Sequence, residues 1–551
     1  MSRKSKGGWL HLALVAALVG AATVVQADPL NCSLAAYEAQ PGLTATVAGE
    51  TLTVTWDGDP GNEVRLRFVL DRGTPTIREL AIRTSGGAWR VLAADVTPEF
   101  RVVSGVRRVT QQQTEPLEAL GVPLTSEKLD EIKWEAFWDA PLYISEEPPL
   151  SHESSIPAAE PFANHPGMPR KPEEVTRATA RYQATGCQVR TNGARIEIAF
   201  PGVEAGIFAG RLRYDVFKGS NLIRQMVIAK TDHPSAAFKY DAGLSGLPAQ
   251  TSARVVWRDL AGHGQDYKLG GPADKGPSVV KSRNRLVAAE LVGGAIAAFP
   301  PPHSFYWARE SEQNLGYSWY RKDSTGTFAF GVRQAEGEED PEFYHNFALY
   351  NARPGTWQRM PVFFYVSPDS GARAMEAALA FTHGDRFKPL PGYKVMGHHY
   401  HVGLVERLGE KGGFDQRLND VATMKAIGMD IYSIIDGARG PGRHDKGALF
   451  LEDLANYYEA ARRQSDTDFL VMPNDENSTG GRPPFVGGHY DILMSKPVFW
   501  RPAREPGEPL AEPHPTYGTV YNLGTPADLM EMTERENVLL SMPHPRAKRS
   551  T

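Results

Sequence analysis

The sequence is poor in cysteine and lacks two features that often reveal a function, namely a long basic run and an apolar run of membrane-spanning length beyond the leader. Only 2 of the 551 residues are cysteine, which excludes a scaffold built from disulfides. Lys and Arg number 60 against 65 Asp and Glu, which gives a formal net charge of −5. We therefore expect no nucleic-acid partner, and no membrane partner once a leader is removed.

The remaining composition is that of a folded, soluble protein. Charged residues make up 23% of the chain, aromatic residues 10% and hydrophobic residues 41%, so large hydrophobic cores can form. At roughly 100–200 residues per domain, the length excludes a single small fold.

The first 27 residues have the organisation of a secretory signal peptide. Three basic side chains stand within the first six residues, and an apolar run over residues 10–25 follows them. Small residues before Ala27 predict cleavage after that residue, so we expect an exported protein, periplasmic or extracellular. The alternative is an uncleaved anchor, which the short apolar run disfavours.

Export changes the meaning of the two cysteines, Cys32 and Cys187. In an oxidising compartment they can form one disulfide, and a loop of that length would stabilise the fold by ~4–5 kcal/mol on the chain-entropy model. Two unrelated buried thiols are the alternative, and the sequence leaves both open.

Short alternating runs predict antiparallel β-structure over residues 28–140 and 173–388. Residues 51–56 and 64–69, for example, flank a turn-rich segment and are typical of a hairpin. Eight prolines fall within residues 141–172, which predicts a long connection. We expect one large β-sandwich or two smaller ones, similar in texture to galactose-mutarotase-like domains but without a shared motif.

After residue 389 the pattern changes to alternating strands and helices. This alternation predicts a parallel α/β barrel or sheet, in which chemistry is found at the carboxyl ends of the strands. The expected strands are residues 393–401, 429–435, 468–473, 489–494 and 538–542, and the main expected helices are residues 414–428, 448–463 and 525–537.

Polar residues of metal-ligand type recur at the ends of these strands. They are His399, His401, Asp436, Glu476, His489 and His544. The two-residue period of a strand places both imidazoles of the first pair on one face, with Tyr400 on the other. Each residue alone has an ordinary structural explanation, such as packing or helix capping. Their recurrence predicts a centre for Zn²⁺, Mn²⁺ or Fe²⁺.

These motifs, in this order, resemble the PHP superfamily of metallohydrolases, and most closely its CehA/McbA-like branch. The resemblance covers about residues 391–551 and implies a distorted TIM-like barrel with two or three divalent metal ions. It further implies that the ligands are His399, His401, Glu476, His489 and His544. Asp436 would be a ligand or a carboxylate that orients a histidine, so Asp436 and Glu476 are the expected catalytic carboxylates.

Two departures from the family pattern stand out. The second strand ends in Ile435-Asp436-Gly437 where the family has Thr-Asp-His, so the histidine ligand is absent there. His444, seven residues beyond Gly437, is either a substitute for that ligand or an ordinary loop histidine. The family's final Asp-x-His motif has no counterpart, because the sequence ends seven residues after His544. We therefore expect an incomplete PHP-like domain; the alternative is a naturally shortened barrel covered by the sandwich region.

The expected function is metal-dependent hydrolysis of a phosphoester or a carboxylic ester or amide through a metal-bound hydroxide. The substrate is expected to be a small molecule or derived from a glycan, and its identity is open. An alternative is a secreted carbohydrate-binding or structural β-sandwich protein with a degenerate, inactive PHP-like domain. Aromatic clusters at residues 305–307 and 317–320 could then stack on sugar rings. A third hypothesis is that the sandwich is itself a carbohydrate-active enzyme acting through Glu310, Glu312 or Glu338. It is the least favoured, because the spacing of these residues has no recognisable pattern.

Overall fold

The computed structural model describes most of the chain between residues 30 and 541. The described residues are 30–107, 114, 117–118, 120–134, 140–141, 175–250, 252–259, 261–301, 317–323, 326–333, 347–348, 350–437, 447–478 and 489–541. The expected signal peptide, nearly all of the proline-rich connection, the first aromatic cluster and His544 lie outside these ranges. None of the described helices is both long and apolar enough to cross a membrane.

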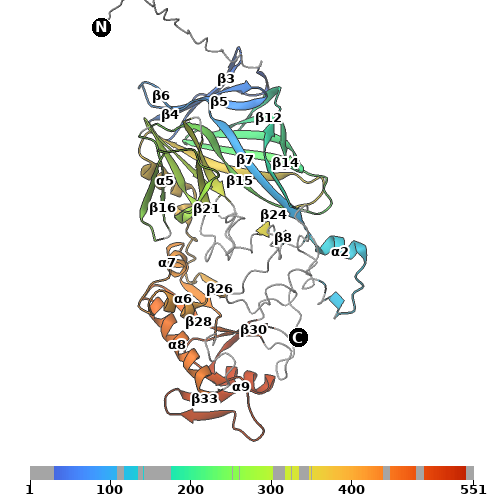
Figure 1. Ribbon diagram of the computed structural model, residues 1–551, viewed down its shortest axis with the longest axis vertical. Helices are drawn as coiled ribbons and strands as arrows, with labels where there is room; N and C mark the ends of the chain where they lie inside the picture. Colours follow the sequence, from blue (N-terminus) through green and yellow to red (C-terminus); the bar gives the residue numbers. More distant parts are fainter. Residues whose placement is uncertain are drawn as a thin grey trace, which may run out of the picture.

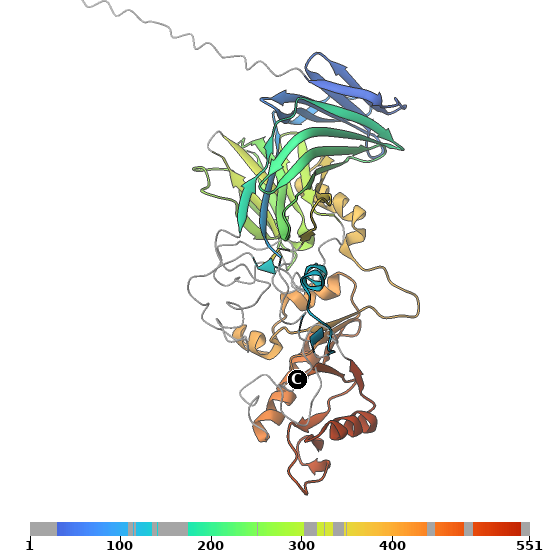
Figure 2. The same cartoon turned by 90° about the vertical axis from the view of Figure 1, so that its right-hand side faces the viewer.

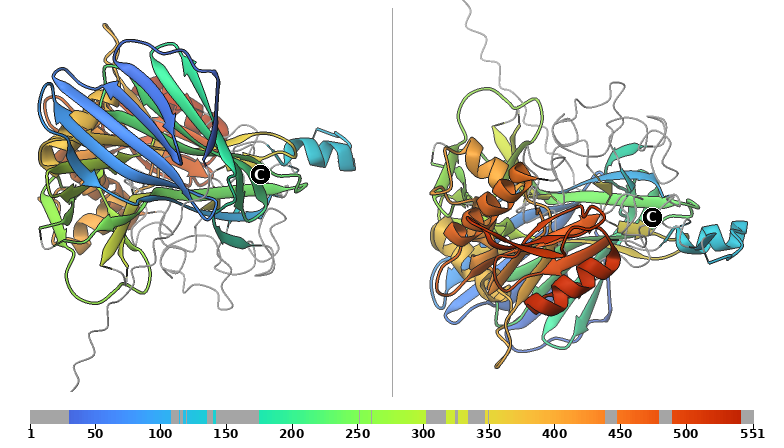
Figure 3. Two further views of the ribbon diagram at one scale, coloured as in Figure 1. Left: turned by 90° about the horizontal axis from the view of Figure 1, so that it is seen from above. Right: turned by 90° about the horizontal axis from the view of Figure 1, so that it is seen from below.

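The molecule is elongated, with its β-rich region at one end and its C-terminal α/β region at the other (Figures 1 and 2). Figure 3 views the chain from each end, with the first strands in front on the left and the C-terminal elements in front on the right. The prediction of a β-rich chain with more than one domain is confirmed in this coarse form.

Three large sheets build the β-rich region of the described chain. The five-stranded sheet has the order β2 (Leu43–Ala48), β3 (Thr51–Asp57), β4 (Asn62–Asp71), β5 (Thr74–Thr84) and β6 (Arg90–Ala93). The seven-stranded sheet has the order β18 (Ser278–Lys281), β21 (Tyr317–Lys322), β22 (Thr327–Arg333), β15 (Ala236–Pro248), β7 (Thr97–Val106) and β9 (Thr176–Thr179), with β24 (Tyr350–Ala352) also paired to β15.

The largest sheet has eleven strands. Its order is β1 (Asn31–Ala36), β11 (Gly186–Asn192), β12 (Arg195–Ala205), β13 (Phe208–Phe217), β14 (Leu222–Lys230), β25 (Gln358–Ser367), β20 (Gly294–Phe299), β19 (Val287–Leu291), β16 (Arg254–Arg258) and β17 (Gly264–Lys268), with β10 (Arg181–Tyr182) paired to β12. Smaller elements are the pair β8 (Ala140–Pro141) and β23 (Phe347–Ala348), the helices α2 (Ser126–Ile132) and α5 (Gly371–Phe381), and the 3₁₀ turns η2 (Arg283–Arg285) and η4 (His383–Asp385).

The segments before and after the proline-rich connection share their sheets and their core. Strand β7 pairs with both β15 and β9, and β1 runs parallel to β11. Phe68 from the first segment packs on Tyr214 from the second, with ring centroids 4.9 Å apart, and both side chains are fully buried. The alternation of apolar and polar residues therefore builds one continuous core across both segments.

The C-terminal region combines three small sheets with four helices among the described residues. A parallel sheet holds β26 (Met396–Tyr400), β27 (Ile431–Ile434) and β28 (Leu470–Pro473), and an antiparallel sheet holds β29 (Asp475–Ser478), β30 (His489–Leu493) and β34 (Leu539–Ser541). A third sheet has the order β31 (Phe499–Arg501), β33 (Gly518–Asn522) and β32 (Ala511–His514). The helices are α6 (Leu404–Glu410), α7 (Asn419–Ala426), α8 (Ala448–Gln464) and α9 (Pro526–Glu536).

The arrangement of the predicted strands differs from the expected parallel barrel or sheet. Only the first three of the five lie parallel to one another, whereas β30 and β34 join the antiparallel sheet with β29. Strand β28 ends at Pro473 and β29 begins at Asp475. Because β29 pairs antiparallel with β30, the chain passes from the parallel sheet into the antiparallel sheet at this point. The described strands form no closed barrel, and a PHP barrel is not evident in them.

Candidate metal centre

Three histidines at the end of β26 reach one region of the C-terminal sheets because the strand is irregular there. His399 has a positive φ of 71°, and the pairing of β26 with β27 shifts register between Gly397 and Tyr400. In a regular strand neighbouring side chains point to opposite faces. The irregularity lets His398 and His399 both contact Asp491, while His401 lies beside His399 with ring centroids 5.3 Å apart.

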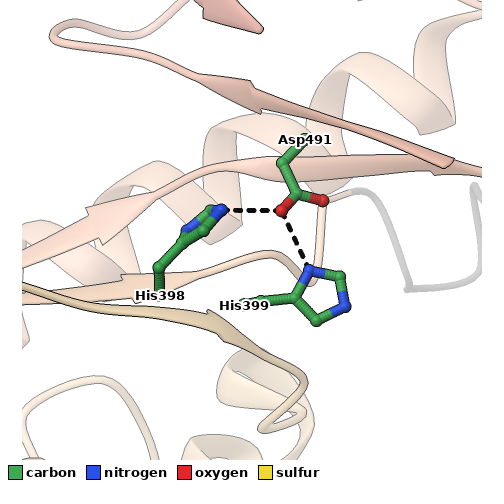
Figure 4. Close-up of side chains that lie close together, drawn as sticks. All are labelled: His398, His399 and Asp491. Carbon is green, nitrogen blue, oxygen red and sulfur yellow. Dashed lines mark hydrogen bonds and ion pairs between the residues drawn. The ribbon is translucent and has the colours of Figure 1, made fainter. Parts of the chain in front are cut away.

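Asp491 is the buried carboxylate to which two of these histidines turn. Its Oδ2 atom lies 2.9 Å from Nδ1 of His399 and 2.7 Å from Nε2 of His398 (Figure 4). The side chain is completely buried, and its other oxygen, Oδ1, has no hydrogen-bond partner in the described part of the chain. A buried carboxylate oxygen without a partner is costly, which favours a ligand at this point.

Glu476 supplies a second carboxylate from the neighbouring strand. Its Oε2 lies 2.9 Å from Nε2 of His401, and its Oε1 lies 3.7 Å from Nε2 of His399. The ladder of β29 and β30 places Glu476 directly opposite Asp491, so both carboxylates lie on one face of the antiparallel sheet. His399 stands between them.

The five side chains form two groups of metal-ligand type that share His399. One contains His398, His399 and Asp491, and the other contains His399, His401 and Glu476. Within each group the candidate ligand atoms lie within 4.8 Å of one another. Histidine and carboxylate together suit Zn²⁺, Mn²⁺ or Fe²⁺. The residues present therefore fit a divalent metal ion.

The local electrostatics keep Asp491 in its charged form. Burial raises the pKa of Asp491, but hydrogen bonds and charge interactions from His398 and His399 outweigh burial, and the pKa lies below its ordinary value. A carboxylate is the form that binds a metal ion.

Asp436, an expected catalytic carboxylate, supports the backbone. Its Oδ1 accepts a hydrogen bond from the Val402 N–H at 3.0 Å, and its Oδ2 accepts one from the Leu404 N–H at 2.9 Å. These bonds hold the turn that follows His401 and the first turn of α6. Tyr400 packs on Tyr432, with ring centroids 4.8 Å apart, as expected for a side chain facing away from the site.

The structure brings together three of the residues named from the sequence: His399, His401 and Glu476. For His489 the structure describes only the backbone, which pairs with Ser478 at the start of β30, and His544 lies outside the described residues. Sequence reasoning missed His398 and Asp491. An aspartate inside the apolar run of β30 was the available signal, because a buried strand seldom carries an unpaired charge.

Cys32 and Cys187 are joined by a disulfide that links β1 to β11. The two residues are direct partners in the parallel ladder, and their Cα atoms are 4.3 Å apart. A bridge of this kind indicates an oxidising compartment.

Comparison with known proteins leaves the family open. No protein-family model and no curated protein matches the chain. Solved structures that align with it include an aldose 1-epimerase candidate from Escherichia coli K12, at 11% identity, 59% of this chain, 99% of that chain and a TM-score of 0.28. A GH36 α-galactosidase, AgaA, from Geobacillus stearothermophilus aligns at 11% identity over 90% of this chain and 63% of that chain, with a TM-score of 0.28.

A TPR-domain protein from Parabacteroides distasonis ATCC 8503 aligns at 8% identity over 58% of this chain and 47% of that chain, with a TM-score of 0.27. Similarities at this level carry no argument about function. Function resides in the chemistry of a site and not in the fold that carries it.

Proposed function

We propose that the protein is an exported, metal-dependent hydrolase whose active site is the centre formed by β26, β29 and β30. The observation that carries the proposal is the convergence of His399, His401 and Glu476 on the region of Asp491, whose buried Oδ1 has no hydrogen-bond partner among the described residues. Packing alone gives no reason to gather these groups around an unpaired oxygen.

The residues that would hold one or two ions are His398, His399, His401, Glu476 and Asp491. A divalent metal ion bound here supplies Lewis acidity, which lowers the pKa of water and polarises the bond to be cleaved. The two groups that share His399 leave room for a second ion, in keeping with the two or three ions that the PHP resemblance implies. Zn²⁺, Mn²⁺ and Fe²⁺ are the proposed metals.

The residues of the chain have separate tasks in this proposal. Oε2 of Glu476 lies 2.9 Å from Nε2 of His401, a separation at which both atoms can bind the same ion. The backbone bonds of Asp436 fix the turn that carries His401. The β29–β30 ladder keeps the two carboxylates opposite one another. Such positioning by neighbouring groups is what a metal site requires of its protein.

Phosphoesters and carboxylic esters or amides are the proposed substrate classes, because both reactions use the same metal chemistry. Export is proposed from the signal-peptide pattern, and the Cys32–Cys187 disulfide supports it. The PHP-like assignment is likewise proposed and is carried by the order of the histidine and carboxylate motifs.

Hydrolysis assays on the full mature chain test this function. With added Mn²⁺ or Zn²⁺, the protein should hydrolyse a generic phosphate ester or carboxylate ester, and the double variant H399A/H401A should lose this activity. The matched control is His514→Ala, a histidine of β32 whose ring stacks on Tyr517 outside the centre. Turnover that survives in the double variant, or metal-free folded protein in every condition, would favour the carbohydrate-binding or structural alternative.

A further inference from the structure

A cavity of about 980 Å³ lies where the chain passes from the β-rich region into the C-terminal region. One wall is the segment directly after η4, which contains Arg386, Phe387 and Lys388. The other lining residues come from the end of α7 and from the positions just before β26, β27 and β28. The cavity is therefore at the amino ends of the parallel strands, whereas the metal centre is at the carboxyl end of β26.

Backbone contacts hold the wall after η4 in place. The N–H of Phe387 donates to the carbonyl of Ile427 at 2.6 Å. Gly428 has a φ of 90°, and a Cβ atom at this position would lie 3.2 Å from the carbonyl oxygen of Phe387. Just before this wall, the three consecutive residues 383–385 have positive φ values of 53°, 70° and 55°. Strained backbone of this kind is concentrated at ligand-binding and switch regions.

The lining of the cavity combines apolar surface with positive charge. Phe387 and Val395 pack on the core of the C-terminal region, and Met429 belongs to that core. Arg386 and Lys388 are exposed, and neither forms an ion pair or a side-chain hydrogen bond within the described part of the chain. Cavities of this size, with apolar walls and a few polar groups, are typical binding sites for small organic molecules.

The other charged groups at the cavity are largely neutralised by their neighbours. Asp430 lies 3.0 Å from Nζ of Lys394, and Lys425 lies 2.6 Å from Oδ2 of Asp466. Asp468 is an exposed carboxylate that forms no ion pair with any residue that the structure describes. The two cations after η4 therefore outnumber the one carboxylate that has no counter-charge, and the cavity favours an anion.

We propose that this cavity binds a small organic anion, whose carboxylate or phosphate group contacts Arg386 and Lys388 and whose apolar body lies against Phe387, Val395 and Met429. A guanidinium group binds carboxylate and phosphate oxygens in pairs, and an ammonium group adds a compact positive charge. The site is separate from the metal centre, and the proposal does not depend on the proposed hydrolase activity.

Calorimetric titration of the full mature chain tests the proposal, with phenylphosphonate and phenylacetate as probes. The protein is first stripped of metal ions with EDTA, so that no ion at the metal centre captures the anion. We expect at least one probe to bind saturably, with a Kd at or below about 1 mM. The double variant H399A/H401A should bind it equally well. Absence of saturable binding of both probes, or binding that is lost in H399A/H401A, would overturn the proposal.

The double variant R386Q/K388Q tests the contacts to the anion. It should weaken binding of the probe by about 10–100-fold, the usual effect of removing hydrogen bonds to a charged group. The matched control is R535Q/K411Q, which removes the same charge from exposed positions on α9 and at the end of α6. This control should bind as wild type does. Equal losses in both double variants would reduce the effect to net charge and overturn the proposal.

Two further comparisons test the rest of the cavity. Asp468→Asn removes a carboxylate that repels the anion, so binding should strengthen by about two- to fivefold. Inorganic phosphate and acetate lack the phenyl ring and should bind at least about tenfold more weakly than phenylphosphonate and phenylacetate, respectively. Equally tight binding of the ring-free anions, or weaker binding of the probe by a folded Asp468→Asn protein, would contradict the proposed site.

Discussion

His399 has a positive φ, a backbone conformation that few residues other than glycine adopt. This conformation shapes the site. Its φ of 71° interrupts the alternation of β26 and allows two consecutive histidines to approach Asp491. Such a conformation costs residues other than glycine roughly 1–2 kcal/mol. Strain of this kind concentrates at functional sites.

Replacing His399 tests the strain directly. His399→Gly should be more stable than His399→Ala by about 1 kcal/mol, because glycine adopts a positive φ without steric cost. Urea unfolding of the metal-free proteins measures the difference. His401 is the matched control, since it is not among the described residues with positive φ, and there glycine should be no more stable than alanine. Equal stabilities of the two His399 variants would contradict the strained strand.

Asp436 offers a second prediction at the same scale. Asp436→Asn places an NH₂ group against a backbone N–H, so the free energy of unfolding should fall by about 1–3 kcal/mol, and metal affinity should fall because the turn after His401 loosens. Thermal unfolding and metal titration measure the two effects. The control is Asp430→Asn: Asp430 likewise accepts a backbone hydrogen bond, from Val395 at 2.8 Å, but near the opposite end of β26. Metal affinity lowered equally by both variants would contradict the assigned role.

The sequence predicted some residues of this site and missed others for definable reasons. His399, His401 and Glu476 could be named because they follow recognisable strands. His398 was missed because a regular strand would turn it away from His399, and the bulge that reverses this has no signature in one sequence. Asp491 was missed because its importance depends on a pairing with β29 that local pattern does not reveal.

At the scale of elements, local signals located the five expected C-terminal strands but predicted their pairing poorly. They missed α6, β29, β31, β32 and β33. Apolar periodicity located α8, and the Thr525-Pro526 pair located the start of α9. The same patterns cannot tell a parallel partner from an antiparallel one. The step from β28 to β29 shows this, because the chain changes sheets there within two residues. Whether two strands pair parallel or antiparallel is decided by contacts between residues that are distant in the sequence.

The capping box of α9 gives a prediction with a defined pH dependence. Oδ2 of Asp528 accepts from the N–H groups of Gly524 and Thr525 at 2.9 and 2.7 Å. Burial raises the pKa of Asp528, but these bonds and Arg504 outweigh burial and lower it. A lowered pKa stabilises the fold above the unfolded value of about 3.9, and this contribution is lost as the pH falls through the folded value.

Asp528→Asn should therefore destabilise the protein by about 1 kcal/mol at neutral pH. The difference from wild type should shrink below about pH 4, where the wild-type carboxylate takes up its proton. Denaturant unfolding at several pH values measures it. Glu531→Gln on the exposed side of the same helix should change stability by no more than about 0.5 kcal/mol. A pH-independent loss in Asp528→Asn would refute the capping role.

At the scale of the whole molecule, the disulfide and the shared core join the β-rich region into a single unit. The bridge spans 155 residues and ties the first strand to a sheet formed mostly after the proline-rich connection. The double variant C32S/C187S should lose about 4–5 kcal/mol of unfolding free energy on the chain-entropy model. Mass spectrometry of the native and reduced protein checks the bridge itself. Two free thiols in the native protein would contradict it.

The central claim is that His398, His399, His401, Glu476 and Asp491 form a centre for divalent metal ions. Elemental analysis of the purified, folded mature chain after Zn²⁺ or Mn²⁺ loading and dialysis tests it most directly, with Asp491→Asn beside it. We predict at least one tightly bound ion per chain, and loss of that ion in a folded Asp491→Asn protein. Folded wild-type protein without stoichiometric metal, or full occupancy in the variant, would contradict the account.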